Sequence, residues 1–140
     1  MSELNVALFD VWAAKAEEDN VSARILLEYD GPAATVCFLC QQMAEKYLKA
    51  FVLLQDRPLR RVHDLEVLLR DCMDLDGSFA DLGSEAKLLT SYYMPSRYPD
   101  DLPEDVRPEE GVSAYEAATR IRTRILGVVD RLLKPPGTKA

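Results

Sequence analysis

His63 is the single histidine of the chain, and its side chain is of the type best suited to proton transfer. An unperturbed imidazole changes its charge close to neutral pH, so it can serve as a general acid or a general base. Asp64 follows directly, and a helix is expected to begin near this pair. Two interpretations of His63 therefore stay open: a catalytic group, or a residue that only borders the start of a helix.

Three arginines precede His63 in a short connector: Arg57, Arg60 and Arg61. A guanidinium group is planar and binds a phosphate through two parallel hydrogen bonds. The connector is therefore a candidate phosphate site. The alternative is a solvated basic turn in an otherwise acidic protein.

A second unusual segment reads Ser-Tyr-Tyr-Met-Pro-Ser-Arg-Tyr-Pro-Asp over residues 91–100. It gathers Tyr92, Tyr93, Arg97 and Tyr98 around an expected helix end. Aromatic rings stack on nucleic-acid bases, and a neighbouring arginine can hold the phosphate. In the alternative interpretation the tyrosines pack the segment onto the rest of the chain and Arg97 pairs with a nearby acid.

The stretch Val36–Leu54 carries the clearest helical pattern of the sequence. Its apolar residues fall on one stripe, which predicts a core-facing helix. Gln41, Glu45, Lys46 and Lys49 lie on the polar side, and we expect that side to be solvated. In the alternative interpretation it forms one wall of a phosphate site together with His63 and Arg97. Glu45 and Lys49 are correctly ordered for a weak ion pair between residues four apart.

Asp19 interrupts the apolar stripe of the preceding helical segment. A carboxylate on a core-facing stripe is costly to bury without a partner. We therefore expect a lysine or an arginine to pair with Asp19.

Cys37 and Cys40 form a C-x-x-C pair, and Cys72 is the third cysteine. The pair sits in an apolar helical stretch without a second ligand pair, so a zinc or redox site is not favoured and core packing is predicted. An odd number of cysteines without a secretion signal is typical of reduced thiols in a cytoplasm. The N-terminal residues are acidic, and no apolar run is long enough for a membrane helix.

The composition narrows the possible functions further. A net charge of −7 argues against nonspecific attraction to nucleic acid, so any phosphate binding needs a local basic patch. The sequence has no Walker loop, Rossmann fingerprint, H-E-x-x-H or G-x-S-x-G motif. We expect neither a cofactor nor a metal.

Periodicity predicts an all-α fold. Helices are expected over residues 8–29, 33–55, 63–72, 79–94 and 113–133, with Gly83 weakening the start of the fourth and Ser113 and Glu116 forming a capping box for the last. Residues 95–110 are expected to form an exposed loop, and no strand pattern occurs. One domain over residues 1–134 should form an antiparallel up-and-down bundle of four main helices plus an accessory helix, followed by a flexible tail at 135–140.

Four blocks of the sequence together resemble the HEPN family (higher eukaryotes and prokaryotes nucleotide-binding). These blocks are Trp12 with Ala16, Asp19 and Ala23; the run Cys37–Ala50; His63-Asp64-Leu65; and Arg97–Asp100. Their order and spacing match the family from about Phe9 to Leu132. Each block alone is a weak signal, whereas the set is fairly specific.

The resemblance implies a helical bundle, often a homodimer, that binds a nucleotide or RNA. Many members are partners of a minimal nucleotidyltransferase in toxin–antitoxin-like pairs, and several are metal-independent ribonucleases. In those nucleases an arginine four to six residues before a histidine holds the phosphate, and the histidine transfers the proton. Here the one match joins Arg57 to His63 and falls in a proline-containing connector, which departs from the helical position of the nuclease motif.

The motif set of this subgroup implies instead that His63 and Arg97 meet from separate elements. Arg97 would then hold a phosphate, and His63 would contact it or move its proton. The further expected ligand contacts are Lys46, Lys49, Arg57, Arg61, Asp64 and Tyr98. Three functions follow: a nucleotide- or RNA-binding partner of a nucleotidyltransferase, a metal-independent endoribonuclease, or a non-catalytic dimerising protein.

Overall fold

The computed structural model describes residues 1–93 and 106–134, and this part of the chain consists of helices and their connections. The elements are α1 (Glu3–Glu28), α2 (Ala33–Leu54), α3 (Leu65–Leu75), the 3-10 helix η1 (Gly77–Leu82), α4 (Gly83–Thr90) and α5 (Pro108–Leu133). No strand occurs in the described ranges, and the predicted all-α bundle is confirmed.

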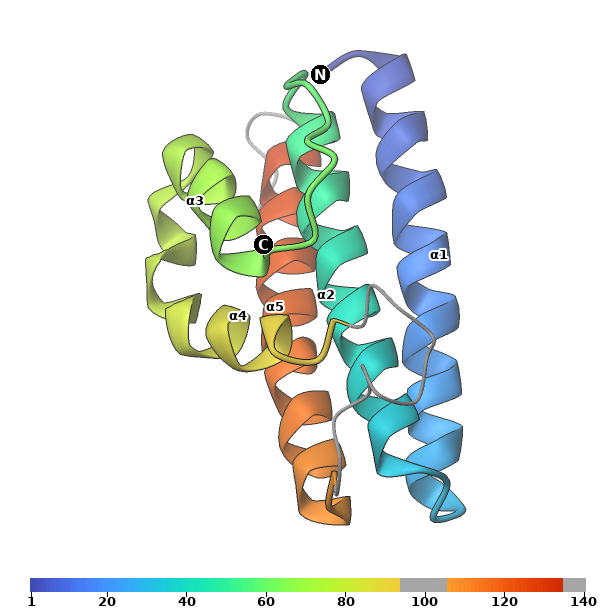
Figure 1. Cartoon of the computed structure of the whole chain (residues 1–140). Coiled ribbons are helices and arrows are strands. Elements are labelled where there is room, and N and C mark those ends of the chain that lie inside the picture. The colour runs from blue at the N-terminus through green and yellow to red at the C-terminus, as the bar shows by residue number, and fades with distance from the viewer. Residues whose placement is uncertain (94–105, 135–140) are drawn as a thin grey trace.

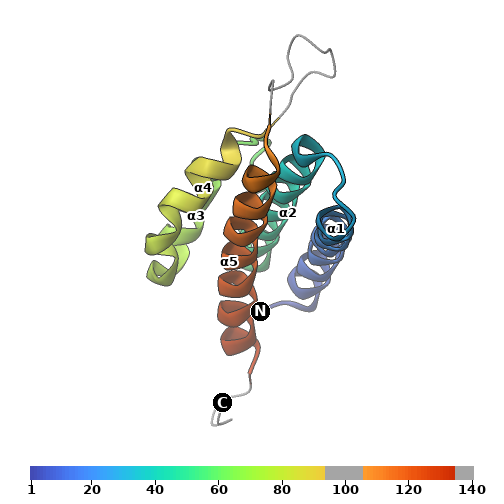
Figure 2. The same ribbon diagram turned by 90° about the horizontal axis from the view of Figure 1, so that it is seen from below.

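Three long helices form the body of the molecule, and two short ones cover one side (Figure 1). Helix α2 is central: it packs against α1, α3, α4 and α5. Figure 2 shows α1 at one edge of the bundle and α3 with α4 at the other. The connector after α2 runs back along this helix (Figure 1). Helix α5 lies beside α2 and runs in the same direction, whereas α1 runs in the opposite direction.

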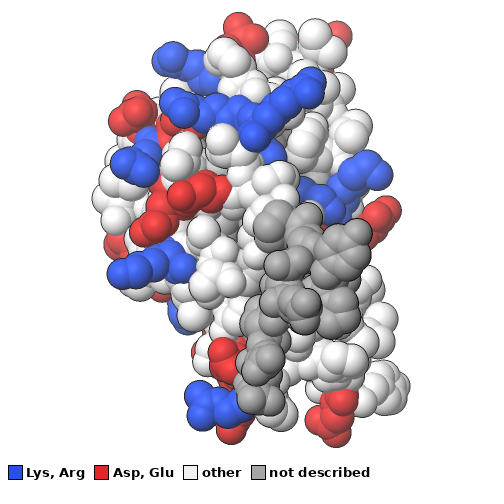
Figure 3. Space-filling model, in the orientation of Figure 1, with Lys and Arg blue, Asp and Glu red and all other residues white. Residues whose placement is uncertain are grey.

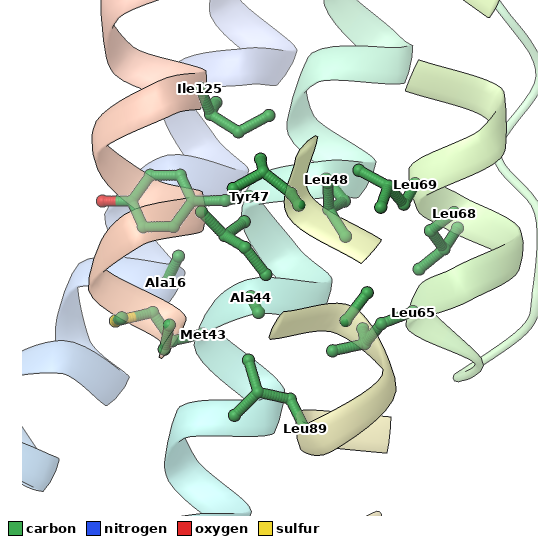
Figure 4. Close-up of a cluster of buried hydrophobic side chains, with 14 of the residues drawn as sticks. Ala16, Met43, Ala44, Tyr47, Leu48, Leu65, Leu68, Leu69, Leu89 and Ile125 are labelled. Atoms are coloured by element: carbon green, nitrogen blue, oxygen red, sulfur yellow. The ribbon is translucent and has the colours of Figure 1, made fainter. Parts of the chain in front are cut away.

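The core forms around α2, as its apolar stripe predicts. Tyr47 and Leu48 of α2 lie among side chains of the flanking helices, including Leu68 of α3 and Ile125 of α5 (Figure 4). All three cysteines are fully buried and free, so core packing of the C-x-x-C pair is confirmed. Burial raises the pKa of the Cys40 thiol to about 12, which leaves it protonated and unreactive.

Helix α1 begins earlier than the expected residue 8. Ser2 caps it, because the serine hydroxyl accepts a hydrogen bond from the backbone N–H of Asn5 at 3.1 Å. The first residues have only a weak apolar pattern, so the sequence did not predict this start. The end of the helix at Glu28 lies within one residue of the predicted end. No helix in the described residues is long and apolar enough to cross a membrane.

The boundaries of α4 and α5 differ from the predictions. The expected helix over 79–94 is divided at Gly83 into η1 and α4, as the glycine suggested, but α4 already ends at Thr90. The predicted start of α5 at Ser113 is wrong, because the helix begins at Pro108 and both members of the expected capping box lie inside it. The side chain of Glu110 instead accepts the backbone N–H of Arg107 at 2.8 Å.

Gly111 explains why the first turn of α5 was difficult to foresee. A glycine usually weakens a helix, but here it faces α2 closely, and a Cβ atom at this position would lie 3.4 Å from Val36. That distance is an ordinary van der Waals contact, so the packing would also accept a small side chain at this position. The expected loop at 95–110 is helical from Pro108, and its residues 95–105, like the tail 135–140, lie outside the described residues.

Candidate functional site

His63 lies at the end of the connector, directly before α3. Asp64 is the N-cap of α3, and its carboxylate accepts the backbone N–H of Glu66 at 2.9 Å. The backbone N–H of Leu65 donates to the Thr90 hydroxyl at 2.9 Å, which ties the start of α3 to the end of α4. The backbone around His63 is therefore fixed from two sides, and Asp64 acts as a cap in this arrangement.

A carboxylate of α2 holds the imidazole. The Nδ1 atom of His63 lies 2.9 Å from Oε1 of Glu45, and the Glu45 side chain is buried. The amide of Gln41, also buried, donates to the same carboxylate oxygen at 3.1 Å and to the backbone carbonyl of His63 at 3.2 Å. Because a carboxylate only accepts, the hydrogen bond places the ring proton on Nδ1 and leaves the lone pair of the neutral ring on Nε2.

Lys49 completes this group of polar side chains. Its ammonium group donates to Oε2 of Glu45 at 3.1 Å, and its side chain is nearly fully buried. The expectation that Lys49 lies on a solvated face is therefore wrong. Gln41, Glu45 and Lys49 follow each other at intervals of one helical turn and satisfy one another beneath the connector. We call them, with His63, the Glu45 cluster.

Tyr93 covers one face of the imidazole. The two rings are stacked, with their centroids 4.2 Å apart and their planes inclined by 14°. The His63 side chain keeps 46% of its surface exposed, and Nε2 has no hydrogen-bond partner among the described residues. The site thus presents an oriented imidazole whose second nitrogen is free to meet a ligand.

The arginines of the connector have different environments. Arg60 forms an ion pair with Asp71 of α3 at 2.9 Å, whereas Arg57 and Arg61 are exposed and form none with the described residues. Figure 3 shows basic side chains gathered over the end of the molecule where the connector leaves α2. A hollow of about 310 Å³ lies there, lined by Arg57, Arg60 and Asp71 among others. Asp71 and Asp74 also line this hollow, so the arginines without an ion pair among the described residues, Arg57 and Arg61, supply the surplus positive charge of the connector.

The remaining predicted residues are placed as follows. Lys46 forms an ion pair with Asp19 of α1 at 2.7 Å, which confirms the basic partner expected for Asp19. Arg97 and Tyr98 lie outside the described residues, so their meeting with His63 stays a prediction. Tyr92 is buried and donates to Glu110 of α5 at 2.9 Å, so it packs the segment onto the bundle, whereas Tyr93 turns to the histidine.

Sequence reasoning placed Gln41 and Glu45 on one possible wall of a phosphate site and Tyr93 among the candidate stacking residues. It did not predict that Glu45 holds the imidazole of His63, that Tyr93 stacks on it, or that Lys49 is buried behind them. The missing information was what covers that face of α2. The connector that covers it has no periodic pattern of its own.

A second polar group joins the long helices on a different side of the bundle. Glu17 of α1 accepts hydrogen bonds from the Tyr47 hydroxyl at 2.5 Å and from Nε of Arg122 in α5 at 3.0 Å. Asn20 donates to Glu17 at 2.8 Å and accepts from Tyr115 at 2.7 Å. We call these five residues the Glu17 cluster.

The electrostatics of the Glu17 cluster are those of a closed network. Burial alone would raise the pKa of Glu17, but the hydrogen bonds from Tyr47, Arg122 and Asn20 outweigh it and lower the pKa below its ordinary value. Burial, together with the hydrogen bond to Glu17, raises the pKa of Tyr47 to about 12. The cluster keeps its charges paired and has no free group.

Known proteins resemble this chain over most of its length. A family model described as the HEPN domain matches residues 9–128. The crystal structure of TT1696 from Thermus thermophilus is 30% identical, covers 85% of this chain and 96% of its own, and superposes with a TM-score of 0.74. The crystal structure of ST0689, an archaeal HEPN homologue, is 27% identical, covers 86% and 97%, and has a TM-score of 0.69. The comparison with curated proteins gives no match.

Proposed function

This chain belongs to the HEPN family, and from that premise we propose that it binds the phosphate of a nucleotide or an RNA at the surface around His63. One observation carries the proposal: a buried carboxylate holds Nδ1 of the only histidine, whose exposed ring stacks on Tyr93 and whose Nε2 has no partner among the described residues. A group held only to support a helix start does not require a buried glutamate and a buried lysine behind it.

The charges of the cluster suit an anion. Lys49 and Glu45 neutralise each other at 3.1 Å, so protonation of His63 adds one net positive charge to the site. The exposed Arg61 adds a guanidinium group two residues from His63, whereas Arg57 lies at the other end of the connector, near Val52 and Leu75. A phosphate held there gains charge-assisted hydrogen bonds, which offset the repulsion from the acidic protein as a whole.

Aromatic rings can bind the base of a nucleotide by stacking on it. Tyr93 stacks on His63 at 4.2 Å and is half-buried, so part of its ring remains accessible for a base. We assign Arg97 as a phosphate ligand and Tyr98 as a further base contact in this proposal. Lys46 is a ligand contact only if it can leave Asp19. Lys49 acts from behind the surface, and the exposed Asp64 caps α3.

The binding is tested by isothermal titration with mononucleotides and with a short single-stranded RNA. We expect His63→Ala and Arg97→Ala each to weaken binding by about tenfold, the loss of one charge-assisted contact. Arg70→Ala is the matched control, because Arg70 lies on the exposed side of α3 without an ion pair among the described residues. A wild-type protein that binds neither ligand would end the proposal.

The same geometry favours a second candidate, a metal-independent endoribonuclease. In that reaction Nε2 of His63 takes the proton of a ribose 2′-hydroxyl, and the 2′-oxygen attacks the adjacent phosphorus. The bond to the 5′-oxygen breaks as that oxygen takes a proton from water, and His63 then returns its proton to the solvent. The hydrogen bond from Nδ1 to Glu45 stabilises the imidazolium that forms, as in other carboxylate–histidine pairs.

Cleavage of RNA in the presence of a chelator separates the two candidates. The nuclease requires that His63→Ala reduce the rate by at least about a hundredfold, the usual contribution of a general base. Glu45→Gln should reduce it less, because the amide oxygen still accepts from Nδ1. If His63→Ala cuts RNA as fast as the wild type, His63 is not the catalyst.

We further propose that the protein is a cytoplasmic homodimer and pairs with a minimal nucleotidyltransferase in a toxin–antitoxin-like system. Family membership and the absence of a membrane-spanning helix from the described residues support this part of the proposal. Co-purification from the native host with a nucleotidyltransferase encoded next to it is the test. Recovery of the chain without such a partner would contradict the pairing and leave the binding of nucleotides unaffected.

A further inference from the structure

Glu45 and Lys49 are the only charged side chains that the described part of the chain buries. Their charged groups lie 3.1 Å apart, and the side chains are exposed by only 6% and 7%. Replacing a buried ion pair by apolar side chains is often neutral or stabilising, so stability alone does not account for this pair. The pair lies directly against His63, so the buried charges of the bundle are concentrated behind one imidazole.

The Glu45 carboxylate accepts hydrogen bonds on both of its oxygens. Oε1 accepts from Nδ1 of His63 at 2.9 Å and from the Gln41 amide at 3.1 Å, whereas Oε2 accepts from Lys49 at 3.1 Å. A carboxylate beside an imidazole favours the imidazolium, and burial strengthens the effect because little water screens the charges. Without a second cation, Glu45 would therefore hold His63 in its charged form.

Lys49 is that second cation. Its ammonium group balances the charge of the carboxylate, and its own positive charge disfavours another positive charge on the ring of His63. With the carboxylate balanced, both forms of the ring are accessible in the range where an imidazole ordinarily changes its charge.

The other charged groups beside the ring are exposed. Arg61 lies two residues before His63 in the connector, and Asp64 follows it and caps α3. At the end of α4 the ring meets Tyr93, which stacks on it. Solvent screens exposed charges, so among the described residues the buried ion pair has the strongest influence on the imidazole.

We propose that Lys49 is a positioning residue that keeps His63 able to gain and lose a proton near neutral pH, and that phosphate binding takes up this proton. In the neutral ring Nδ1 donates to Glu45 and Nε2 carries a lone pair. This lone pair repels a phosphate oxygen, because both are acceptors, whereas the imidazolium donates from Nε2. Proton and phosphate therefore bind together, and each raises the affinity for the other by the same factor.

This inference rests on the proposed phosphate site at His63 and names how pH regulates it. Phosphate binding requires the imidazolium, whereas cleavage of RNA would begin from the neutral ring, which accepts the proton of the 2′-hydroxyl. A lower pH therefore favours binding, and a higher pH favours the general base.

The role of Lys49 is tested by NMR, because His63 is the only histidine and its ring protons report a single titration. Lys49→Met leaves Glu45 unbalanced, and we expect the midpoint of this titration to rise by about one pH unit or more. Lys49→Arg keeps the cation and should keep the midpoint close to that of the wild type. Lys46→Met is the matched control, since it removes a cation of the same helix that pairs with Asp19 instead.

A double variant keeps the test decisive where Lys49→Met fails to fold. Glu45→Gln together with Lys49→Met removes both buried charges, and the midpoint should stay close to that of the wild type. Glu45→Gln alone should lower it, because Lys49 then faces the ring without a balancing carboxylate. Circular dichroism checks the fold of each variant. An unchanged midpoint in folded Lys49→Met, or a double variant shifted by about one unit or more, would overturn the inference.

Proton uptake is tested by isothermal titration at pH 6, 7 and 8 with a short single-stranded RNA that carries 2′-O-methyl groups and no terminal phosphate. This RNA offers no 2′-hydroxyl to react, and it lacks the terminal phosphate whose second proton dissociates near pH 6. We expect the wild-type affinity to fall by about tenfold per pH unit on the alkaline side of the NMR midpoint. His63→Ala should bind more weakly and without this pH dependence.

The two measurements separate this inference from the proposed function. Equal wild-type affinity at pH 6 and pH 8 would overturn the uptake of a proton while leaving the phosphate site in place. A wild type that binds no RNA at any pH would end the proposed function and proton uptake together, and the NMR midpoints would still decide whether Lys49 sets the charge of His63.

Discussion

The Glu45 cluster and the Glu17 cluster are both built around a glutamate that is held by a cation and by neutral donors. They differ in where the partners come from. Tyr47, Arg122 and Asn20 reach Glu17 from three long helices, and the hydrogen-bonding groups satisfy each other. In the Glu45 cluster one partner, His63, comes from the connector, and its ring is exposed and has no partner at Nε2 among the described residues.

The difference separates a structural network from a candidate site. Polar groups in the interior of a bundle are tolerated when they are fully paired, and such networks add specificity to the packing of helices. In the Glu45 cluster the buried side chains are paired, but the exposed imidazole of His63 can still bind a ligand. The predictions below change members of each cluster and measure whether stability or binding responds.

The largest effect is expected from Lys49→Met in the Glu45 cluster. The substitution retains the aliphatic volume but leaves the buried carboxylate of Glu45 without its cation, which should lower the free energy of unfolding by about 3 kcal/mol. Urea denaturation at pH 8 measures it. Lys46→Met is the matched control one turn earlier: its ion pair with Asp19 is partly exposed, and we expect about 1 kcal/mol or less. Equal losses would mean that Lys49 is not buried as described.

Arg122→Met should have a smaller effect on stability. The arginine and Glu17 remain about one-third exposed, so solvent screens the pair and we expect a loss of about 1 kcal/mol in urea denaturation. Nucleotide binding should not change, because the cluster has no free group. A loss of nucleotide affinity in Arg122→Met would remove the distinction between a closed and an open cluster.

The pH dependence of stability should report the Glu17 cluster at both extremes. The pKa of Glu17 is lowered in the folded protein, so its contribution is present above the unfolded value near 4.5 and is lost as the pH falls through the folded pKa. The pKa of Tyr47 is raised to about 12, so its contribution is present below about 10 and is lost as the pH rises toward 12.

Thermal denaturation of Glu17→Gln measures the acid part of this pH dependence, and thermal denaturation of Tyr47→Phe measures the alkaline part. The first variant should lose less stability than the wild type between neutral pH and the acid range, and the second should lose less between pH 10 and 12. Tyr115→Phe serves as the control, since Tyr115 contacts Asn20 rather than Glu17. Parallel curves for Tyr47→Phe and the wild type in the alkaline range would show that the tyrosine does not titrate as assigned.

The smallest effects on stability are expected in the connector. Arg61→Ala and Arg60→Ala should each change the free energy of unfolding by less than about 0.5 kcal/mol, because both side chains are exposed. Titration with nucleotide should distinguish them: Arg61 has no ion pair with the described residues and is available, whereas Arg60 is held by Asp71. A stronger loss of binding in Arg60→Ala than in Arg61→Ala would contradict this assignment.

The sequence predicted the ends of α2 accurately. Its apolar stripe has a single period and follows Pro32, so both ends were predicted to within one residue. In α5 the first turn is held by Glu110, which accepts from the backbone N–H of Arg107 and from the Tyr92 hydroxyl, and neither hydrogen bond appears in a periodic pattern. The helix interior was predictable from local pattern, whereas its start depended on a tertiary contact.

The same division applies to the candidate site. Three features stood out by residue type alone: His63, the connector arginines and the tyrosine-bearing segment 91–100. That Lys49 is buried, that Glu45 holds the histidine and that Tyr93 rather than Tyr92 faces it could not be read from the sequence, because the aperiodic connector decides what covers the polar side of α2.

The sequence by itself determined an all-helical bundle of the HEPN family, since helix period, breakers and motif order are local properties of the chain. Only the tertiary structure decided which polar residues become partners, because hydrogen bonds and ion pairs depend on atoms that meet across long stretches of chain. Glu45 and His63 are 18 residues apart in the chain and 2.9 Å apart in the fold. That meeting converts a face predicted to be solvated into the interior wall of a site.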